Sequence, residues 1–157
     1  MALIKSISGI RGTIGEVPGE NLTSADIARF TASFGKIILG EKRNAKIVIG
    51  RDGRISGEMV RNIVVTNLIK LGIDVIDLGL STTPTVELAV KMENADGGII
   101  ITASHNPKEW NALKLLNREG EFISAETGAK VLEKAEQAEL VFSSVDKLPK
   151  TSTGGKI

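Results

Sequence analysis

The chain has 157 residues, the size of a single domain, and 41% of them are hydrophobic, enough to bury a core. It has no cysteine, which excludes disulfides and thiolate metal sites, and its formal charge of +1 favours neither nucleic acid nor anionic membranes as partners. Because only 3% of the residues are aromatic and no apolar run approaches a membrane span of roughly 18 residues, we expect a cytoplasmic protein with no nucleic acid or membrane partner.

The first predicted elements are a helix, a strand and a second helix. Thr23 caps the first helix, with Asp26 placed to complete a capping box, and Gly40 ends it. The β-branched run KIVIG at 46–50 predicts a strand covered on both faces. An apolar stripe at helical spacing then predicts a second helix over 56–72. The first residue of this segment, a serine, can cap the helix, and its last residue, a glycine, ends it.

The second part of the chain continues the alternation. Residues 73–79 predict a strand, and a helix starts at Thr83 because the proline that follows is favoured in the first turn. The apolar run 97–101 predicts a further strand, and a helix with a charged outer face is expected over 124–140. The segment 112–117 returns too soon for a helical crossover, so we expect it to be an antiparallel partner of the strand before it.

This order of elements predicts an α/β fold, a three-layer α/β/α sandwich with a mixed, mainly parallel sheet. We expect one domain over residues 1–148. The tail 149–157 is rich in Gly, Ser, Thr and Lys and lacks an apolar stripe, which predicts a linker or a disordered end.

The predicted chemistry lies where the strand 97–101 ends, because ligands of open α/β sheets bind beyond the carboxyl ends of the strands. Ser104 follows that strand, and Asn106 and Pro107 stiffen its loop. Lys114 on the returning strand and Arg11 in a glycine-flanked loop offer two cations. A polar turn is the simpler interpretation of such a loop, but a hydroxyl surrounded by cations and backbone donors suits a phosphate group.

Four short stretches carry a resemblance to a known family. TASHNP at 102–107, followed by WNALK at 110–114, resembles the active-site serine loop of the α-D-phosphohexomutases, the family of phosphoglucomutase, phosphomannomutase and phosphoglucosamine mutase. GIRG at 9–12 and GRDGRIS at 50–56 resemble two further signatures in the family's order. The resemblance implies an isomerase in which a phosphoserine at Ser104 exchanges phosphate with a hexose phosphate between C1 and C6.

The resemblance also implies roles for residues of these motifs. Ser104, His105, Lys114 and Arg11 would be catalytic, with His105 either accepting the sugar hydroxyl proton or making a structural hydrogen bond to the loop. Phosphate or substrate binding falls on Arg11, Thr102, Asn106, Asn111 and Lys114, and the two asparagines would alternatively hold the loop. Adjacent side chains point in different directions, so His105 does not suit a hydrolase triad with Ser104.

Other motif residues have structural interpretations. We expect Arg51, Asp52 and Arg54 to brace, through ion pairs, the loop that opens the second helix, rather than to contact substrate. Trp110 is expected to be a half-buried wedge in the serine loop, sugar stacking being the alternative. Ala112 replaces a glycine usual in the family, and it would be strained by about 1 kcal/mol if that position required a positive φ.

The family has four domains, and the resemblance covers only the first. It implies Mg²⁺ held through the Ser104 phosphate with its other ligands from a missing domain, hexose 1,6-bisphosphate as activator, and the remaining domains as partners. We therefore expect the chain to fold but to be inactive alone. Which hexose phosphate is the substrate stays open. The alternative is a phosphate- or nucleotide-binding module without chemistry.

Overall fold

The computed structural model describes residues 3–6, 9–137 and 151–153. Its elements in chain order are β1 Ile4–Ser6, β2 Gly9–Ile14, β3 Asn21–Leu22, α1 Ser24–Leu39, β4 Lys46–Arg51, α2 Gly57–Lys70, β5 Asp74–Leu80, α3 Thr83–Met92, β6 Gly97–Ile101, β7 Trp110–Leu116, α4 Ala125–Gln137 and β8 Thr151–Thr153. The four predicted helices and the three predicted strands are confirmed, although the last three residues of the predicted helix 124–140 lie outside the described residues.

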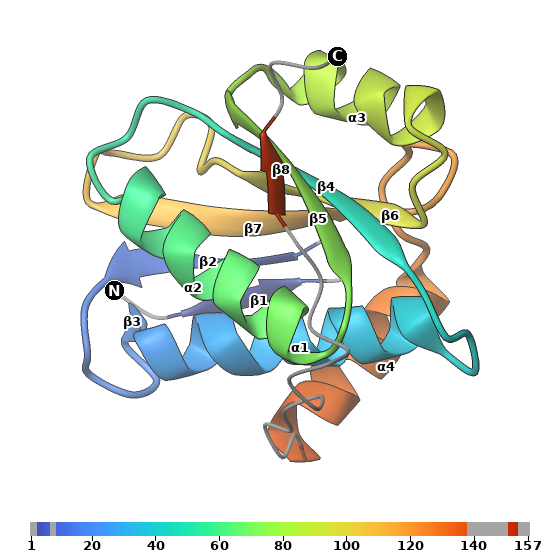
Figure 1. The fold of residues 1–157 in the computed structure, drawn as a ribbon. Coiled ribbons are helices and arrows are strands. Elements are labelled where there is room, and N and C mark those ends of the chain that lie inside the picture. Colours follow the sequence, from blue (N-terminus) through green and yellow to red (C-terminus); the bar gives the residue numbers. More distant parts are fainter. Residues whose placement is uncertain (1–2, 7–8, 138–150, 154–157) are drawn as a thin grey trace.

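One eight-stranded sheet runs through the described part of the molecule in the order β1-β2-β7-β6-β4-β5-β8, with β3 beside β2 (Figure 1). Strands β6, β4 and β5 are parallel, as helical crossovers require. Strand β7 is antiparallel to both β6 and β2. The predicted mixed sheet and the predicted antiparallel return after β6 are therefore confirmed.

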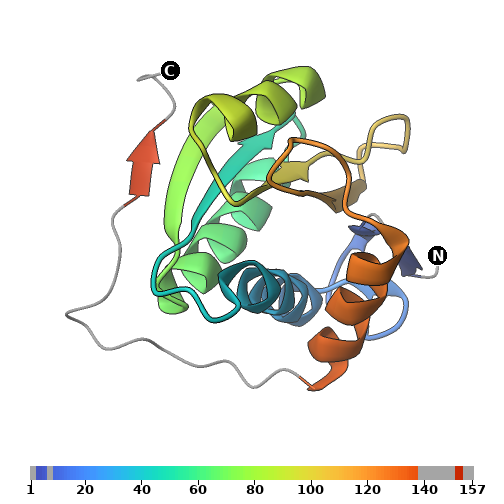
Figure 2. The same ribbon diagram turned by 90° about the vertical axis from the view of Figure 1, so that its right-hand side faces the viewer.

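The helices lie on both faces of the sheet, which makes three layers (Figures 1 and 2). Side chains alternate across a strand, so Ile47 and Ile49 of β4 join the core beneath α1, α2 and α4, whereas Val48 packs beneath α3. Phe34 of α1 is fully buried in the larger core. Because α3 contacts β4 and β6, it covers only part of its face of the sheet.

The predicted caps differ between the first two helices. Thr23 and Asp26 form the complete capping box at the start of α1, and Gly40 with a φ of 52° ends that helix, as predicted. Helix α2 does begin after Ser56, but the Ser56 hydroxyl makes no capping bond. It accepts a hydrogen bond from Asn111 instead, which ties the start of α2 to β7.

One expectation about irregular segments was wrong, and the structure adds a short strand within the tail. Arg11 does not lie in a loop, because GIRG forms β2 and pairs along its length with β7. Within the tail 149–157, residues 151–153 form β8, which pairs in parallel with β5. A short edge strand is held by main-chain hydrogen bonds and needs no apolar stripe, so composition did not reveal it. The domain boundary at residue 148 stays a prediction.

None of the described helices combines the length and the apolar character that crossing a membrane requires.

Candidate active site

Ser104 stands where the sheet ends and the backbone turns sharply. The preceding strand β6 is buried along its whole length, and Thr102 and Ala103 are still buried, whereas Ser104 is exposed. The φ of Ser104 is 51°, in the left-handed region that residues other than glycine enter rarely. Strained backbone of this kind is concentrated at functional sites, which makes Ser104 a candidate functional residue.

Lys114 brings a positive charge directly to this hydroxyl. Its neighbours Leu113 and Leu115 are fully buried in the core beneath α1, so alternation along β7 places Lys114 on the opposite face. From there the Lys114 Nζ donates to the Ser104 Oγ over 2.5 Å. The predicted approach of this ammonium to the serine is therefore confirmed.

Arg11 and Lys114 line one cavity of about 190 Å³. In the pairing of β2 with β7, Gly9 lies opposite Lys114 and Arg11 lies opposite Ala112, so both cations are on the same face of the sheet. Gly9 packs directly against the main chain of β7, where a Cβ would collide with the Leu113 carbonyl oxygen. Arg11 is exposed and its side chain makes no hydrogen bond or ion pair with another described residue, so its guanidinium is available to a ligand.

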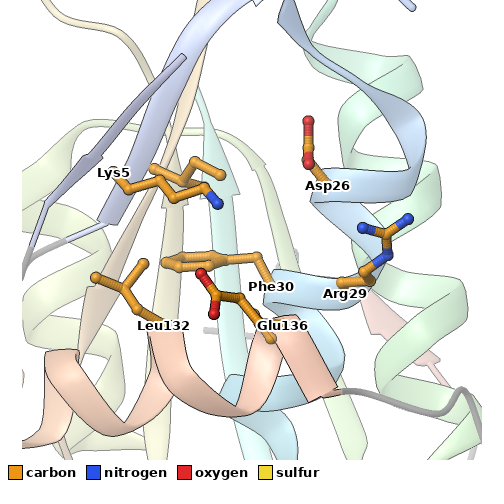
Figure 3. Close-up of a pocket in the computed structure, with 8 residues that line it drawn as sticks. Lys5, Asp26, Arg29, Phe30, Leu132 and Glu136 are labelled. Carbon is orange, nitrogen blue, oxygen red and sulfur yellow. The ribbon is translucent and has the colours of Figure 1, made fainter. Parts of the chain in front are cut away.

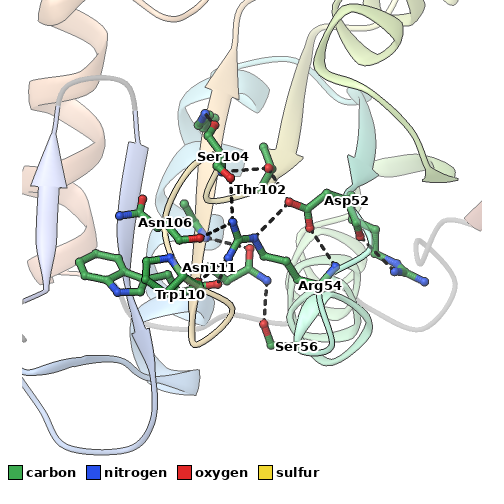
Figure 4. A network of polar contacts seen from close by, with 12 residues as sticks. Asp52, Arg54, Ser56, Thr102, Ser104, Asn106, Trp110 and Asn111 are labelled. Atoms are coloured by element: carbon green, nitrogen blue, oxygen red, sulfur yellow. Dashed lines mark hydrogen bonds and ion pairs between the residues drawn. The ribbon is translucent and has the colours of Figure 1, made fainter.

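An ion pair between Arg54 and Asp52 lies beneath the serine loop (Figure 4). Arg54 Nε donates to Asp52 Oδ2 over 3.2 Å, and the Arg54 side chain is only 11% exposed. The same Asp52 oxygen accepts from the Thr102 hydroxyl over 2.6 Å. The predicted ion pairing is thus confirmed for Asp52 and Arg54, which brace the Ser104 loop across the sheet edge as well as the loop before α2. The Arg51 guanidinium donates instead to the Asp52 main-chain carbonyl.

Several motif residues are committed to holding this loop. Asn111 is fully buried, donates through Nδ2 to Ser56 and accepts through Oδ1 from the Ala112 amide, so its side chain is used internally. The Thr102 hydroxyl is occupied by Asp52 and by the Ser104 amide. Of the two interpretations of Asn111, loop support is the one that these contacts favour. Because the Thr102 hydroxyl donates its proton to Asp52, it has none left to donate to a phosphate.

Trp110 and Ala112 differ from expectation. Trp110 is buried, with 5% exposure, and packs with Ala103 and Ala112 rather than standing as a half-buried wedge. This burial leaves its ring no surface for stacking on a sugar. Ala112 lies in the regular strand β7 without a positive φ, so the strain anticipated there is absent. The strained position is Ser104 instead.

His105 and Asn106 complete the set of predicted residues. His105 is exposed next to Ser104, and its imidazole makes no hydrogen bond with another described residue. A structural hydrogen bond from this ring to the described part of the loop is therefore not present. Asn106 enters the network through its carbonyl oxygen, which accepts from Arg54 Nη2 over 2.8 Å.

Comparison with known proteins connects this geometry to a family. Residues 4–141 match the family model described as phosphoglucomutase/phosphomannomutase, alpha/beta/alpha domain I. The chain belongs to this family. The expectation that the motifs raised is thereby confirmed for the fold and for the family.

The chain is similar to several longer members of the phosphoglucomutase/phosphomannomutase family. It is 40% identical over 126 residues to a phosphoglucomutase/phosphomannomutase of Thermococcus kodakarensis, covering 80% of this chain and 27% of that protein. It is 36% identical over 152 residues to a phosphoglucosamine mutase of Levilactobacillus brevis, covering 94% and 31%. The fold matches that of a family protein from Burkholderia thailandensis with a TM-score of 0.72 at 24% identity, covering 96% and 33%. The chain thus spans between a quarter and a third of these relatives.

The described residues do not by themselves suit the magnesium ion that the phosphohexomutase family implies. They include no group of three or more His, Asp or Glu side chains that could hold a metal. Asp52, the acidic residue of the serine network, is committed to Arg54 and Thr102. Mg²⁺ prefers a nearly complete octahedron of oxygen ligands, which a single serine oxygen does not provide.

A second hollow lies between β1, α1 and α4, away from the serine (Figure 3). Phe30 and Leu132 form its apolar side, and the charged side chains of Lys5, Arg29 and Glu136 lie around it. Its volume is about 50 Å³. Since one water needs roughly 10–15 Å³ of such volume, this hollow has room for a few waters and not for a sugar phosphate.

Proposed function

We propose that this chain is the serine-bearing domain of a phosphohexomutase, in which Ser104 carries the phosphoryl group that moves between C1 and C6 of a hexose phosphate. The observation that carries the proposal is the Lys114 ammonium on the Ser104 hydroxyl, with Arg11 in the same cavity. Two cations and one hydroxyl at an open strand end fit a phosphate monoester better than they fit a neutral ligand.

The chemistry of the phosphoserine supports storage of the group at Ser104. A serine phosphate is an alkyl phosphate monoester like a sugar 6-phosphate, so we expect the exchange between them to be nearly thermoneutral. Spontaneous hydrolysis of phosphate monoesters is among the slowest known reactions. A phosphate placed on the exposed Ser104 would therefore survive in water until a sugar hydroxyl is positioned against it.

The residues of this chain divide the transfer step between them. The sugar hydroxyl oxygen forms its bond to phosphorus as the bond from phosphorus to Ser104 Oγ breaks. Lys114 lies beside this leaving oxygen, neutralises its charge and gives it a proton, while Arg11 stabilises the charge on the other phosphoryl oxygens. When Ser104 Oγ later attacks the other phosphate of the bisphosphate, Lys114 takes its proton back, the bond from that phosphorus to the sugar oxygen breaks, and this oxygen receives the proton that the first sugar hydroxyl gave up.

His105 is the proposed acceptor of the sugar hydroxyl proton. Imidazole suits this role because a ring nitrogen can accept a proton and later return it. Its exposure and its lack of a described partner support the role, since a base must be free to reach substrate. A His105→Gln variant of the full-length parent should lose turnover, and near-normal turnover would exclude the base role.

Mass spectrometry tests the central step. Protein purified from cells, and protein incubated with hexose 1,6-bisphosphate together with the rest of its parent protein, should carry one phosphate on Ser104. Ser104→Ala should carry none, and Lys114→Met should acquire it much more slowly. Absence of phosphate from Ser104 under both conditions would favour a binding module without chemistry and refute the proposal.

The remaining parts of the family's chemistry are proposed to come from outside this chain. Other domains would grip the sugar hydroxyls, supply the distal phosphate site and provide the further ligands of Mg²⁺ bound through the Ser104 phosphate. Hexose 1,6-bisphosphate would act as activator by loading Ser104. The chain alone is then expected to be inactive, and measurable conversion between hexose 1- and 6-phosphates by the purified chain would contradict this.

A further inference from the structure

Arg54 directs every donor of its guanidinium into the protein. Its Nε is paired with Asp52, and its Nη1 and Nη2 groups each donate to two main-chain carbonyl oxygens. Three of these oxygens belong to the serine loop, at Ser104 (2.9 Å), Asn106 (2.8 Å) and Pro107 (2.6 Å), and the fourth is that of Trp110 (3.1 Å), where β7 begins. A guanidinium has five N–H donors, so none remains for a substrate phosphate.

Both polar groups of the Ser104 main chain lead to the same ion pair (Figure 4). The Ser104 carbonyl accepts from Arg54, and the Ser104 amide donates to the Thr102 hydroxyl over 3.2 Å. Thr102 in turn donates to Asp52 over 2.6 Å, and the Asp52 oxygen that accepts it also accepts Arg54 Nε. The ring of contacts closes around the one residue of the loop that has a positive φ.

We propose that Asp52 and Arg54 are positioning residues that hold Ser104 in its left-handed conformation and so aim its hydroxyl at Lys114, with Thr102 as the link to the serine amide. A non-glycine residue persists in this region only where its surroundings fix it. The Asp52 carboxylate also balances the Arg54 charge, so that the net positive charge beside Ser104 comes from Lys114 and Arg11. The inference relies on the proposed function only for what the aimed hydroxyl does.

The geometry requires arginine and not merely a positive charge. Four carbonyl oxygens around one planar group need a fork of donors, whereas a lysine ammonium has three donors at one point. Arg54→Lys therefore keeps the charge opposite Asp52 and loses most of the loop contacts. Asp52→Asn keeps an acceptor for Thr102 and loses the charge that orients Arg54.

Nuclear magnetic resonance on the labelled chain tests the positioning directly. The coupling between the amide and α protons of Ser104, together with its Cβ chemical shift, reports its φ. We expect the signature of a left-handed φ in the unmutated chain and its loss in Arg54→Lys and in Asp52→Asn. The matched control is Arg61→Lys, which alters a comparable ion pair between Arg61 Nε and Asp77 Oδ2 (2.6 Å) in α2 and β5. It should leave the Ser104 signals unchanged.

A second measurement follows the rate at which Ser104 is phosphorylated by hexose 1,6-bisphosphate when the rest of the parent protein is present. We expect Arg54→Lys to slow this rate by about 10- to 100-fold, since small displacements of reacting groups cost about that much. A Ser104 that keeps its left-handed signature in both variants overturns the inference. If no protein is ever phosphorylated, the proposed function fails, and the resonance measurement still decides whether Asp52 and Arg54 hold the serine.

Discussion

Replacing Ser104 by glycine and by alanine separates the cost of its backbone conformation from the loss of its hydroxyl. Both variants lose the same hydrogen bond to Lys114, and Ser104 is exposed, so neither removes core packing. They differ in how they tolerate a φ of 51°. Glycine enters this region without a steric penalty, whereas a residue with a Cβ does not.

The size of the difference follows from two opposing terms. A left-handed conformation costs a non-glycine residue about 1–2 kcal/mol, and glycine elsewhere costs about 0.5–1 kcal/mol relative to alanine through the entropy of the unfolded chain. At Ser104 the first term exceeds the second. We therefore expect Ser104→Gly to be more stable than Ser104→Ala by roughly 0.5–1 kcal/mol.

Urea denaturation followed by fluorescence measures this difference, because Trp110 is the only tryptophan and is buried beside the loop. The matched control is Lys108, an exposed loop residue without a positive φ, where Lys108→Ala should be more stable than Lys108→Gly by about 0.4–1 kcal/mol. The order of the two variants should thus reverse between the positions. If Ser104→Ala equals or exceeds Ser104→Gly in stability, the serine is not strained and this reasoning is wrong.

Three further predictions concern other parts of the chain. Gly9→Ala would press a Cβ onto a backbone carbonyl of β7 and onto the Lys114 Cα at 3.2 Å. The free energy of unfolding of this variant, measured by urea titration, should fall by about 1–3 kcal/mol. Gly53→Ala, where the added Cβ has open space around it, should leave the free energy of unfolding unchanged in the same titration. Partial burial raises the pKa of Asp96, but hydrogen bonds from Lys42 and a backbone amide outweigh it and lower the pKa below 3.8. The stabilisation by the Asp96 carboxylate is complete above about pH 4 and is lost as pH falls through the lowered pKa. Asp96→Asn should therefore destabilise the protein at neutral pH and progressively less below pH 4. An equal loss of stability at neutral pH and below pH 4 would contradict this. Thr23→Ala removes half of the capping box and should lower the free energy of unfolding by about 1 kcal/mol, and an unchanged melting curve would show that this cap contributes nothing.

The sequence was most informative where local chemistry and tertiary structure agree. The apolar run 97–101 is a strand because its residues are buried on both faces, and Thr23 and Gly40 bound a helix because the hydroxyl of one and the absent side chain of the other suit their positions. Ser104 and Lys114 could be predicted as partners because the short return after β6 brings them together.

The sequence was least informative where contacts are made by the main chain. Arg54 lies 50 residues before the serine whose carbonyl it binds, and carbonyl oxygens have no signature in a sequence. The strand at Arg11 was mistaken for a loop because its glycines suggested flexibility, whereas pairing with β7 imposes an extended conformation. The condition for strain at Ala112, a positive φ, is not met, and the positive φ falls on Ser104, whose carbonyl is bound by a residue distant in sequence.

The alternation along β7 ties correct folding to correct chemistry. A shift of one residue in its pairing would turn Lys114 into the apolar core and expose Leu113 and Leu115 to water. A mispaired molecule would lose its solvent-shielded leucines and its reactive ammonium together. Molecules that reach the stable folded state should therefore all present the same arrangement of ammonium and serine, and assembly errors should appear as aggregated or degraded chains instead of inactive but well-folded protein.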